Sequence, residues 1–332
     1  MNDEICCAGA TIIPRPPPTL PIDPNKYTVY QTSLISINDV IWNKIIARDT
    51  SGNLYYRNAA DYKYYKIPSG GGQTFLAGNN TYGNFIPGVG AAAQFTLQPR
   101  GIVVDSSNNL FVVENNIPRI IKIEPNGNVT SFAGSGTAGY TDGGANTAEF
   151  NELESIAIDA SNTLYVHERG RKTIRKITSS GQVSTLTFSS ASTLYFSNIA
   201  VDSLGVIYAA EPSLHRVYKI TPTGPTTADI ALLAGSTAGY ANGQGSAAQF
   251  NLNTQSGLCV DMYGNVYVGD NNNGSVRKIT PSSNVITIFG NGTNGTTDTS
   301  TQLQNPGKLV VDSNGVIYIA TSRSFQKITP VS

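Results

Sequence analysis

The sequence predicts an all-β protein, a six-bladed β-propeller, from three observations. A pattern of short strands recurs six times along the 332 residues. The strands are rich in β-branched and aromatic residues and alternate with Gly- and Asn-containing turns, whereas helical periodicity is nearly absent. Polar capping repeats, which an open stack of repeats needs at its two ends, are not found. A ring that closes on itself needs no such caps.

Each copy of the pattern begins with an apolar strand that ends in an aspartate. These residues are Asp49, Asp105, Asp159, Asp202, Asp261 and Asp312, spaced 56, 54, 43, 59 and 51 residues apart. A second strand of the type Leu-Tyr-Val follows a polar turn, as at 109–112 and 265–268. A third strand contains Lys followed by Ile, at Lys66, Lys122, Lys176, Lys219, Lys278 and Lys327. A fourth strand, as at 128–133 and 284–289, completes a unit of about 50 residues, a period typical of propeller blades.

The two ends of the chain predict how the ring closes. The sixth copy stops after its third strand, at 327–332, and the segment 27–34 precedes the first copy and belongs to none. We expect this segment to supply the outer strand of the sixth blade. The propeller then occupies 26–332. Residues 1–25 are predicted to form a separate arm, whose prolines from Pro14 to Pro24 favour an extended polyproline conformation.

The linkers between copies carry a second recurring pattern. Gly-rich segments at 133–144 and 234–243 run into short stretches that end in Phe150 and Phe250, and a related stretch ends in Phe95. Together with the strand pattern, these linkers resemble NHL repeats over roughly residues 27–332. The resemblance implies a six-bladed propeller. It also implies an acid at the end of the second strand that is followed by a basic residue opening the third strand, and Arg119 and Arg216 match this basic position.

Composition excludes several classes of function. The 22 basic and 22 acidic residues cancel, and together they make up 13% of the chain, against about 25% in an ordinary soluble domain. A balanced charge predicts no nucleic-acid partner. No apolar run approaches the length of a membrane span, and acids stand where a secretory signal needs cations. We therefore expect no membrane span and see no signal peptide, and we favour an extracellular or particle-surface location.

Candidate binding residues gather on one face of the predicted ring. In an up-and-down blade, the second-to-third strand loops and the inter-blade linkers share one face, which we call the linker face. The first-to-second strand turns lie on the opposite turn face. The second strands end at the linker face with Glu114, Glu168, Glu211 and Asp270. Such clustered oxygens suit calcium, although ion pairs or turn caps are the interpretation we prefer. The linkers add Tyr82, Tyr140 and Tyr240, which we expect to be exposed and to contact a sugar or peptide.

Other polar residues favour structural roles. The six repeated aspartates precede turns, and aspartate stabilises a turn by accepting hydrogen bonds from the backbone two residues on. His167 and Glu168 are adjacent and point to opposite faces of their strand, so they do not form a general-base pair. His167 is expected to be packed or exposed, and His215 to be structural. We predict no catalytic residue, no metal ligand and no cofactor, and calcium is the ion that we keep as an alternative.

The cysteines carry the remaining hypothesis. Cys259 occupies a position filled in other copies by Ala or Val, so we expect it in the core. Cys6 and Cys7 lie on the arm, where a bond to another chain fits better than a strained bond between neighbours. An aliphatic residue followed by this Cys pair is similar to the arms of disulfide-linked bacterial spore-appendage subunits. We therefore expect a non-catalytic structural protein that binds copies of itself in a surface assembly such as a filament or virion.

Two alternatives from other classes stay open. One is a metal-dependent hydrolase or lyase of the six-bladed type, because propellers of this kind hold metals near the ring axis with His residues or with Glu/Asn/Asp sets. It predicts a cation within reach of Glu114, Glu168, Glu211 or Asp270. The other alternative is a sugar- or peptide-binding module that uses the linker tyrosines.

Overall fold

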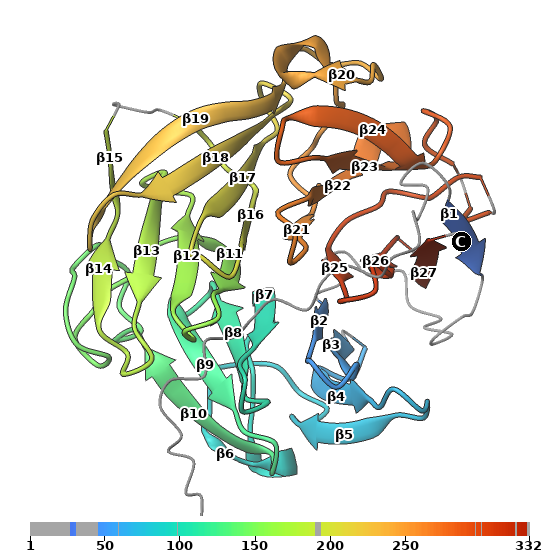
Figure 1. Ribbon diagram of the computed structural model, residues 1–332. Coiled ribbons are helices and arrows are strands. Elements are labelled where there is room, and N and C mark those ends of the chain that lie inside the picture. The colour runs from blue at the N-terminus through green and yellow to red at the C-terminus, as the bar shows by residue number, and fades with distance from the viewer. Residues whose placement is uncertain are drawn as a thin grey trace, which may run out of the picture.

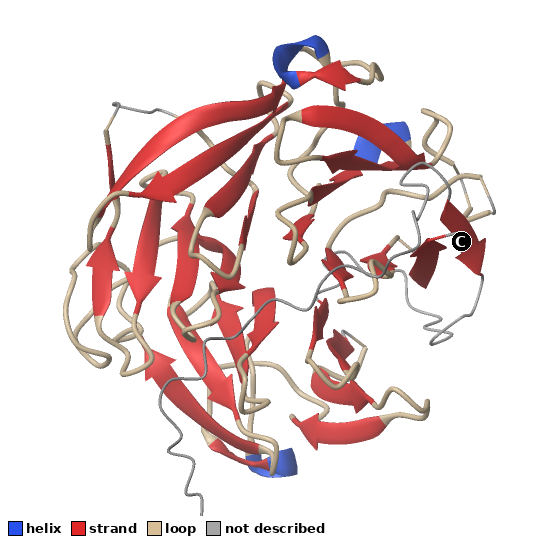
Figure 2. Cartoon of the chain, in the orientation of Figure 1, coloured by secondary structure: helices blue, strands red, loops and turns tan. Residues whose placement is uncertain are grey.

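Six sheets, antiparallel except for one short parallel pair in the fourth, stand around a common axis in the computed structural model, as Figure 1 shows. The structure describes residues 27–30, 46–58, 60–97, 99–189, 194–295, 297–299, 301–322 and 324–330. Each sheet is one blade, and the predicted all-β, six-bladed propeller is confirmed. Figure 2 shows how little of the described chain is helical. None of the helices in these ranges is long and apolar enough to span a membrane. The predicted arm, 1–25, and its Cys6 and Cys7 lie outside the described residues.

The two innermost strands of each blade are the Val-Asp and Leu-Tyr-Val strands of the repeat. The first strands of blades 1 to 6 are β2 (Ile46–Arg48), β7 (Pro99–Val104), β11 (Leu153–Ile158), β16 (Asn198–Val201), β21 (Leu258–Val260) and β25 (Leu309–Val311). The second strands are β3 (Leu54–Asn58), β8 (Leu110–Glu114), β12 (Leu164–Glu168), β17 (Ile207–Glu211), β22 (Val266–Asp270) and β26 (Ile317–Ala320). The first strands face the axis, and each is therefore an edge of its sheet.

The outer half of each blade follows the same order. The third strands are β4 (Lys63–Ile67), β9 (Arg119–Ile123), β13 (Thr173–Ile177), β18 (Arg216–Pro222), β23 (Ser275–Ile279) and β27 (Phe325–Pro330). The fourth strands of blades 1 to 5 are β5 (Thr74–Ala77), β10 (Asn128–Ala133), β14 (Val183–Thr185), β19 (Thr227–Gly235) and β24 (Asn284–Phe289). Blades 2, 4 and 5 add a short fifth strand, namely β6 (Gly88–Val89), β15 (Thr187–Phe188) and β20 (Gly243–Gln244). The 3-10 helices are η1 (Gly90–Ala92), η2 (Gly245–Ala247) and η3 (Asn271–Asn273).

The ring closes as the sequence predicts. Strand β1 (Tyr27–Tyr30) pairs antiparallel with β27, with Tyr27 opposite Pro330 and Tyr30 opposite Lys327. It thus forms the outer strand of blade 6, whose other three strands come from the far end of the chain. This pairing brings strands from the two ends of the chain into one blade (Figure 1).

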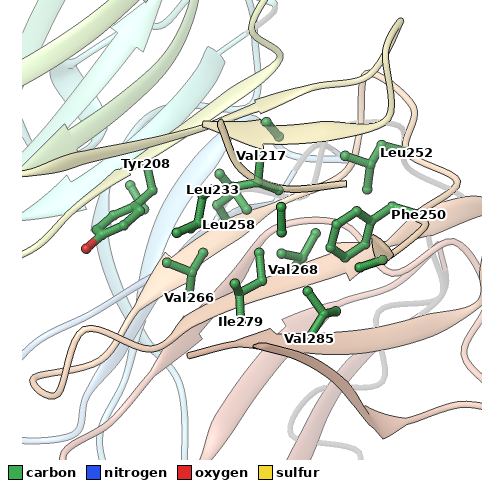
Figure 3. Close-up of a cluster of buried hydrophobic side chains, with 14 residues drawn as sticks. Tyr208, Val217, Leu233, Phe250, Leu252, Leu258, Val266, Val268, Ile279 and Val285 are labelled. Carbon is green, nitrogen blue, oxygen red and sulfur yellow. The ribbon is translucent and has the colours of Figure 1, made fainter. Parts of the chain in front are cut away.

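The hydrophobic core is divided into six clusters, each between two neighbouring blades. Figure 3 shows the cluster between blades 4 and 5, where Val217 and Leu233 face Val268 and Val285 across the linker residue Phe250. Alternation along a strand sends successive side chains to opposite faces, so every blade contributes to two clusters. The cluster that closes the ring, between blades 6 and 1, has six buried members among the described residues. Cys259 is buried in the cluster of blades 5 and 6, as predicted.

The repeated aspartates cap the turns of the turn face, which confirms their predicted role. Asp261 is typical, because its carboxylate accepts hydrogen bonds from the backbone N–H groups of Tyr263 at 2.9 Å and Asn265 at 2.8 Å. It also accepts a bond from the Tyr267 hydroxyl at 3.0 Å. Asp49, Asp105, Asp159, Asp202 and Asp312 accept the equivalent backbone bond four residues on. The carboxylates of this face are therefore engaged in local structure.

Candidate functional site at the linker-face end of the channel

The predicted acids lie where the topology puts them, and they are buried. Glu114, Glu168 and Asp270 have no exposed surface, and Glu211 is 2% exposed. Glu114, Glu168 and Asp270 accept hydrogen bonds from the backbone N–H groups of Thr96, Asn151 and Asn251, each of which follows a linker phenylalanine. Glu211 binds the turn after its own strand, through Ser213 and the N–H of Leu214. These acids fasten linkers and turns to the blades.

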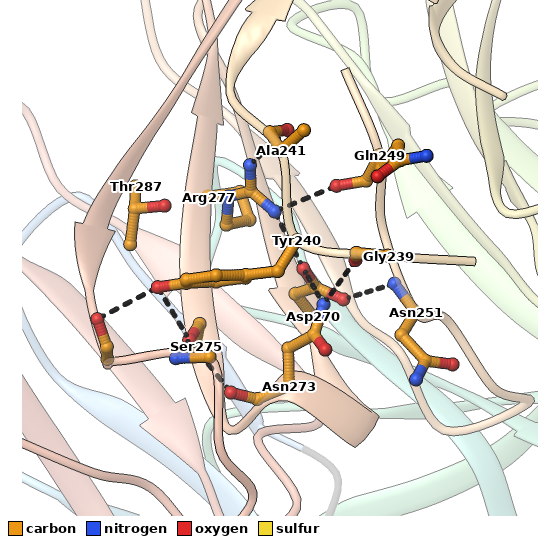
Figure 4. Close-up of polar contacts among 12 residues, drawn as sticks. Gly239, Tyr240, Ala241, Gln249, Asn251, Asp270, Asn273, Ser275, Arg277 and Thr287 are labelled. Atoms are coloured by element: carbon orange, nitrogen blue, oxygen red, sulfur yellow. Dashed lines mark hydrogen bonds and ion pairs between the residues drawn. The ribbon is translucent and has the colours of Figure 1, made fainter. Parts of the chain in front are cut away.

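In blade 5, Arg277 joins one of these acids to the preceding linker (Figure 4). Its guanidinium donates to Asp270 Oδ2 at 2.9 Å and to the carbonyl oxygens of Gln249 at 3.0 Å and Ala241 at 2.9 Å. The same guanidinium lies 5.0 Å from the ring centroid of Tyr240 and 5.2 Å from that of Phe250. Arg277 is fully buried, and we call this arrangement the blade 5 linker clamp.

Blade 3 repeats the clamp with different residues. Arg175 donates to Glu168 Oε2 at 3.1 Å, to the carbonyl oxygen of Glu149 at 2.8 Å and to Asp142 Oδ1 at 2.8 Å. It lies 5.0 Å from the centroid of Phe150. Burial raises the pKa of both Glu168 and Asp270, and the paired arginine and the hydrogen bonds to each carboxylate act against that rise. The partner arginines stand two residues inside the third strand, whereas the family resemblance pointed to Arg119 and Arg216 at its start.

The three predicted tyrosines do not share one environment. Tyr82 is 53% exposed and lies against Tyr62, with ring centroids 5.0 Å apart. Tyr140 and Tyr240 are only half-buried rather than exposed, which corrects the expectation for these two. Asn151 donates to the Tyr140 hydroxyl, and the Tyr240 hydroxyl donates to the carbonyl oxygen of Gly290 at 3.0 Å. Tyr240 lies against the clamp arginine Arg277, whereas Tyr140 lies beneath Arg171, with the guanidinium 5.2 Å from its ring centroid.

A channel of about 490 Å³ runs along the ring axis between the six first strands. Its middle is lined by aliphatic residues such as Ile102, Ile156, Ile199, Leu258 and Leu309. Because the first strands are sheet edges, alternate backbone N–H and C=O groups also face the channel without a partner strand. The channel can therefore hold a small molecule that is partly aliphatic and partly polar.

At the turn-face end, the charged side chains that line the channel are paired. Arg48 lies 3.3 Å from Asp312 Oδ2, and its guanidinium lies 5.3 Å from the centroid of the Tyr318 ring. Asp312 also caps its own turn, through the backbone N–H groups of Asn314 and Val316. Arg48 is the residue that departs from the apolar pattern of the other copies, and here it ties blade 1 to blade 6.

At the linker-face end, Lys308 differs from the other charged residues because it has no ion pair within the described ranges. Arg100 in β7 and Glu154 in β11 are 3.9 Å apart, at the outer limit of an ion pair. Lys308, just before β25, lines the same end of the channel together with Asn198 in β16. Among the described residues, the Lys308 ammonium forms no ion pair and no hydrogen bond. Arg100 and Glu154 lie just before the lining residues Gly101 and Ile156 in the chain, and Tyr195 lies shortly before Asn198. We call these three residues, together with Asn198 and Lys308, the channel mouth.

Electrostatic interactions connect these residues across the ring. Desolvation lowers the pKa of Lys308 to about 8, the Glu154 carboxylate raises it and the Arg100 charge lowers it further. Burial raises the pKa of Tyr195, and Glu154 adds to this effect. Lys308 belongs to blade 6 and Glu154 to blade 3, which stand opposite each other in the ring. The amine is thus held as a partly desolvated cation at the entrance to an aliphatic channel.

His167 lies beside the mouth as a buried polar group. It has no exposed surface, and neither ring nitrogen has a hydrogen-bond partner among the described residues. Its ring packs edge-on against Phe196 at 5.7 Å and Tyr195 at 6.4 Å. Burial lowers its pKa to about 3, and the Lys308 charge adds to that shift. The hydroxyls of Tyr195, Ser155 and Ser197 are also buried without a partner in the described part of the chain.

The mouth arises where the blades depart from their repeat. The position of Lys308 is Gly101, Ser155, Asn198 and Gly257 in blades 2 to 5. A Cβ atom at Gly101 would lie 2.8 Å from the Ile156 side chain, and one at Gly257 would lie 2.3 Å from the carbonyl oxygen of Gly307. Neither position can therefore hold a side chain such as that of lysine without a shift of the neighbouring atoms. The sequence prediction missed Arg100, Glu154 and Lys308 because it was based on the residues that the six copies share. The available signal was a charged residue at a position where other copies have a small one.

His215 has a structural role, as the sequence predicts. Its Nδ1 accepts a hydrogen bond from the backbone N–H of Leu252 at 3.1 Å, and so it supports the linker that enters blade 5. Within the described ranges, no group of three or more His, Cys, Asp or Glu side chains is placed to hold a metal ion.

Comparison with known proteins gives the fold. No model of a protein family matches the chain. Among solved structures, an auxiliary nutrient-binding protein from Bacteroides ovatus is similar over 93% of this chain and 78% of its own, with 14% identity and a TM-score of 0.64. A gluconolactonase from Xanthomonas campestris is similar over 94% and 97%, with 10% identity and a TM-score of 0.62. Virginiamycin B lyase from Staphylococcus aureus is similar over 89% and 97%, with 12% identity and a TM-score of 0.55. At these identities the likeness concerns architecture alone, and it identifies the chain as a six-bladed β-propeller.

Proposed function

We propose that the protein is a binding module that takes a small organic anion into the linker-face end of its central channel. One observation carries this proposal: the Lys308 ammonium, with no ion pair among the described residues, stands at the entrance of an aliphatic-walled channel of about 490 Å³. A carboxylate pairs with such a cation, and a short aliphatic body fits the walls behind it. The nutrient-binding protein from Bacteroides ovatus supports the view that this architecture serves binding.

The sequence suggested a binding module that uses the linker tyrosines, and the present proposal places the ligand at the channel mouth instead. Tyr240 lies against the blade 5 linker clamp, Tyr140 lies beneath Arg171, and the four acids hold linkers and turns. Lys308 and Asn198 instead line the channel. A negatively charged ligand is favoured over a neutral sugar because the charge of Lys308 is the least compensated one at the mouth.

The other two hypotheses have less support. The gluconolactonase and the lyase share the fold, but a metal-dependent reaction needs a ligand set, and the described residues contain no such cluster. The assembly hypothesis depends on Cys6 and Cys7, which lie outside the described residues, and no contact of the described chain supports a filament or virion subunit.

Calorimetric titration of the full chain with hexanoate tests the proposal. Charge-assisted hydrogen bonds contribute about 1.5–3 kcal/mol, so Lys308→Gln is expected to weaken binding by about ten- to a hundredfold. Arg48→Gln is the matched control, because it removes a cation from the opposite end of the same channel. It should leave the affinity within about twofold. Absence of binding, or an equal loss in both variants, would contradict the proposal.

The pH dependence gives a second measurement. The ammonium form of Lys308 predominates below its pKa of about 8. Hexanoate binding is therefore expected to be strongest below about pH 8 and to decline above it, because the ligand keeps its charge while Lys308 loses its proton. A flat profile up to about pH 10 would show that another cation binds the carboxylate.

A further inference from the structure

We propose that Lys308 holds a carbonyl-bearing organic acid covalently, as a reversible imine. The inference rests on the proposed function and adds a chemical step to it. The ligand class is an α-oxo acid, whose carboxylate lies among the cations of the channel mouth and whose carbonyl carbon meets Lys308 Nζ. The aliphatic part of the ligand extends into the channel.

The position of Lys308 supplies the geometry for this reaction. Lys308 lines the channel, whose volume of about 490 Å³ leaves room for a ligand next to this residue. At the equivalent positions of blades 2 and 5, glycines let the first strands pack closely against their neighbours. Among the described residues, no carboxylate lies within ion-pair distance of Lys308, so none holds it permanently charged. An amine acts as a nucleophile only after it loses its proton, and desolvation next to a second cation promotes that loss.

The neighbouring groups fit the remaining requirements. The guanidinium of Arg100 adds positive charge for the carboxylate of the acid, and this charge lowers the pKa of Lys308. The Glu154 carboxylate, 3.9 Å from Arg100, raises the pKa of Lys308 and so keeps the amine from losing its charge completely. The walls of Ile156, Ile199 and Leu309 limit access of water to the product.

The step is balanced without any redox partner. The neutral Nζ of Lys308 attacks the carbonyl carbon, a C–N bond forms, and a proton moves from the nitrogen to the carbonyl oxygen to give a neutral carbinolamine. The C–O bond then breaks, the oxygen takes one further proton from solvent and leaves as water, and a protonated imine remains. Addition of water reverses the sequence and releases the acid and the amine.

Reductive trapping tests the inference on the full-length protein. The chain is incubated with α-oxohexanoate and sodium cyanoborohydride near neutral pH, and the modified lysines are located by peptide mass mapping. A lysine with a pKa of about 8 has a far larger neutral fraction at that pH than an ordinary lysine. We expect Lys308 to be modified at least about tenfold faster than the third-strand lysines of the same molecule. Modification of Lys308 at the rate of those lysines would overturn the inference.

Two controls separate the covalent step from simple binding. Arg48→Lys places an amine at the opposite end of the channel, next to Asp312, and this amine should react slowly because the carboxylate keeps it protonated. α-Hydroxyhexanoate has the same carboxylate and chain but no carbonyl. If it binds with dependence on Lys308 while α-oxohexanoate leaves no adduct, the binding function stands and the imine is refuted. If neither compound binds, the proposed function itself fails.

The contribution of the carboxylate is measured with a neutral ketone of the same chain length. Trapping of this ketone at Lys308 is expected to be at least about tenfold slower than trapping of α-oxohexanoate, because it lacks the charge that the mouth attracts. Equal rates would overturn the assignment of an α-oxo acid as the ligand class.

Discussion

The linker clamps and the channel mouth lie at the same ends of the blades, yet their polar groups are in opposite states. In the clamps, Arg175 and Arg277 are buried and donate to carboxylates and to backbone carbonyls. At the mouth, Lys308 has no ion pair within the described ranges, and Arg100 and Glu154 are 3.9 Å apart. A buried polar group is costly unless it is paired, so a satisfied network stabilises the fold and an unsatisfied one is open to a ligand.

In this repeat protein, the clamps and the mouth differ in whether their residues recur from blade to blade. The clamps are made of residues that recur, since Asp270 and Glu168 occupy one position in two blades and their arginines another. The mouth is made of residues that vary between blades: the position of Lys308 is Gly, Ser or Asn in blades 2 to 5, and the position of Glu154 is Arg100 in blade 2. Repeated residues build the ring, and the departures from the repeat distinguish one end of the channel from the other.

Removing a clamp arginine should give the largest effect. Arg277→Ala leaves Asp270 buried without its cation and frees two carbonyl groups, so the free energy of unfolding should fall by about 3–5 kcal/mol. Arg175→Ala should cost a similar amount, because its contacts repeat those of Arg277. Arg169→Ala is the control, as this exposed guanidinium only lies over the Tyr195 ring at 5.5 Å. Urea unfolding provides the measurement, and a loss below about 1 kcal/mol in both clamp variants would contradict their structural role.

Low pH should destabilise the folded protein through His167, whose ring nitrogens are buried without a partner among the described residues. Its pKa is lowered from 6.5 to about 3 in the folded protein, so the unfolded chain binds a proton between these values that the folded chain does not. The stabilisation is complete above about pH 6.5 and is lost as the pH falls towards the folded value. Each pH unit costs about 1.4 kcal/mol, which amounts to about 3 kcal/mol near pH 4.5.

A matched variant isolates this contribution. His167→Leu removes the titrating group, so its stability should exceed that of the wild type near pH 4.5 and differ little near pH 7. The buried acids Glu114, Glu168 and Asp270 have raised pKa values and act in the opposite direction, but they are present in both proteins. Parallel stability curves for the two proteins from pH 7 to about pH 4 would show that His167 does not carry the acid sensitivity.

Replacing Lys308 should give the smallest effect, and one of opposite sign. Lys308→Met removes a desolvated cation that has no ion pair among the described residues, and we expect about 1 kcal/mol of stabilisation near pH 7. Because the pKa is lowered from 10.5 to about 8, the wild type gains stability as the pH rises through this window. The advantage of the variant should therefore shrink above pH 8. Lys122→Met is the control, since Lys122 pairs with Glu124 at 3.1 Å, and it should not stabilise the protein.

The sequence alone determined the propeller, because a blade is a local structure. Four short strands, a turn capped by an aspartate such as Asp261, and a linker that ends in a buried phenylalanine all lie within about 50 residues of chain. The closure of the ring by β1 followed from counting strands, since the sixth copy lacks one. These features depend on hydrogen bonds between residues close in the chain and on a hydrophobic periodicity that can be read from the sequence.

Only the tertiary structure decided which polar residues are satisfied. The sequence marked Glu168 and Asp270 as candidates for binding, and the ring places an arginine against each of them. No pattern in the sequence connects Lys308 with Glu154, which are 154 residues apart and stand in opposite blades of the ring. The charge environment of a side chain depends on its distance in space from other charged groups, and this distance cannot be read from their spacing along the chain.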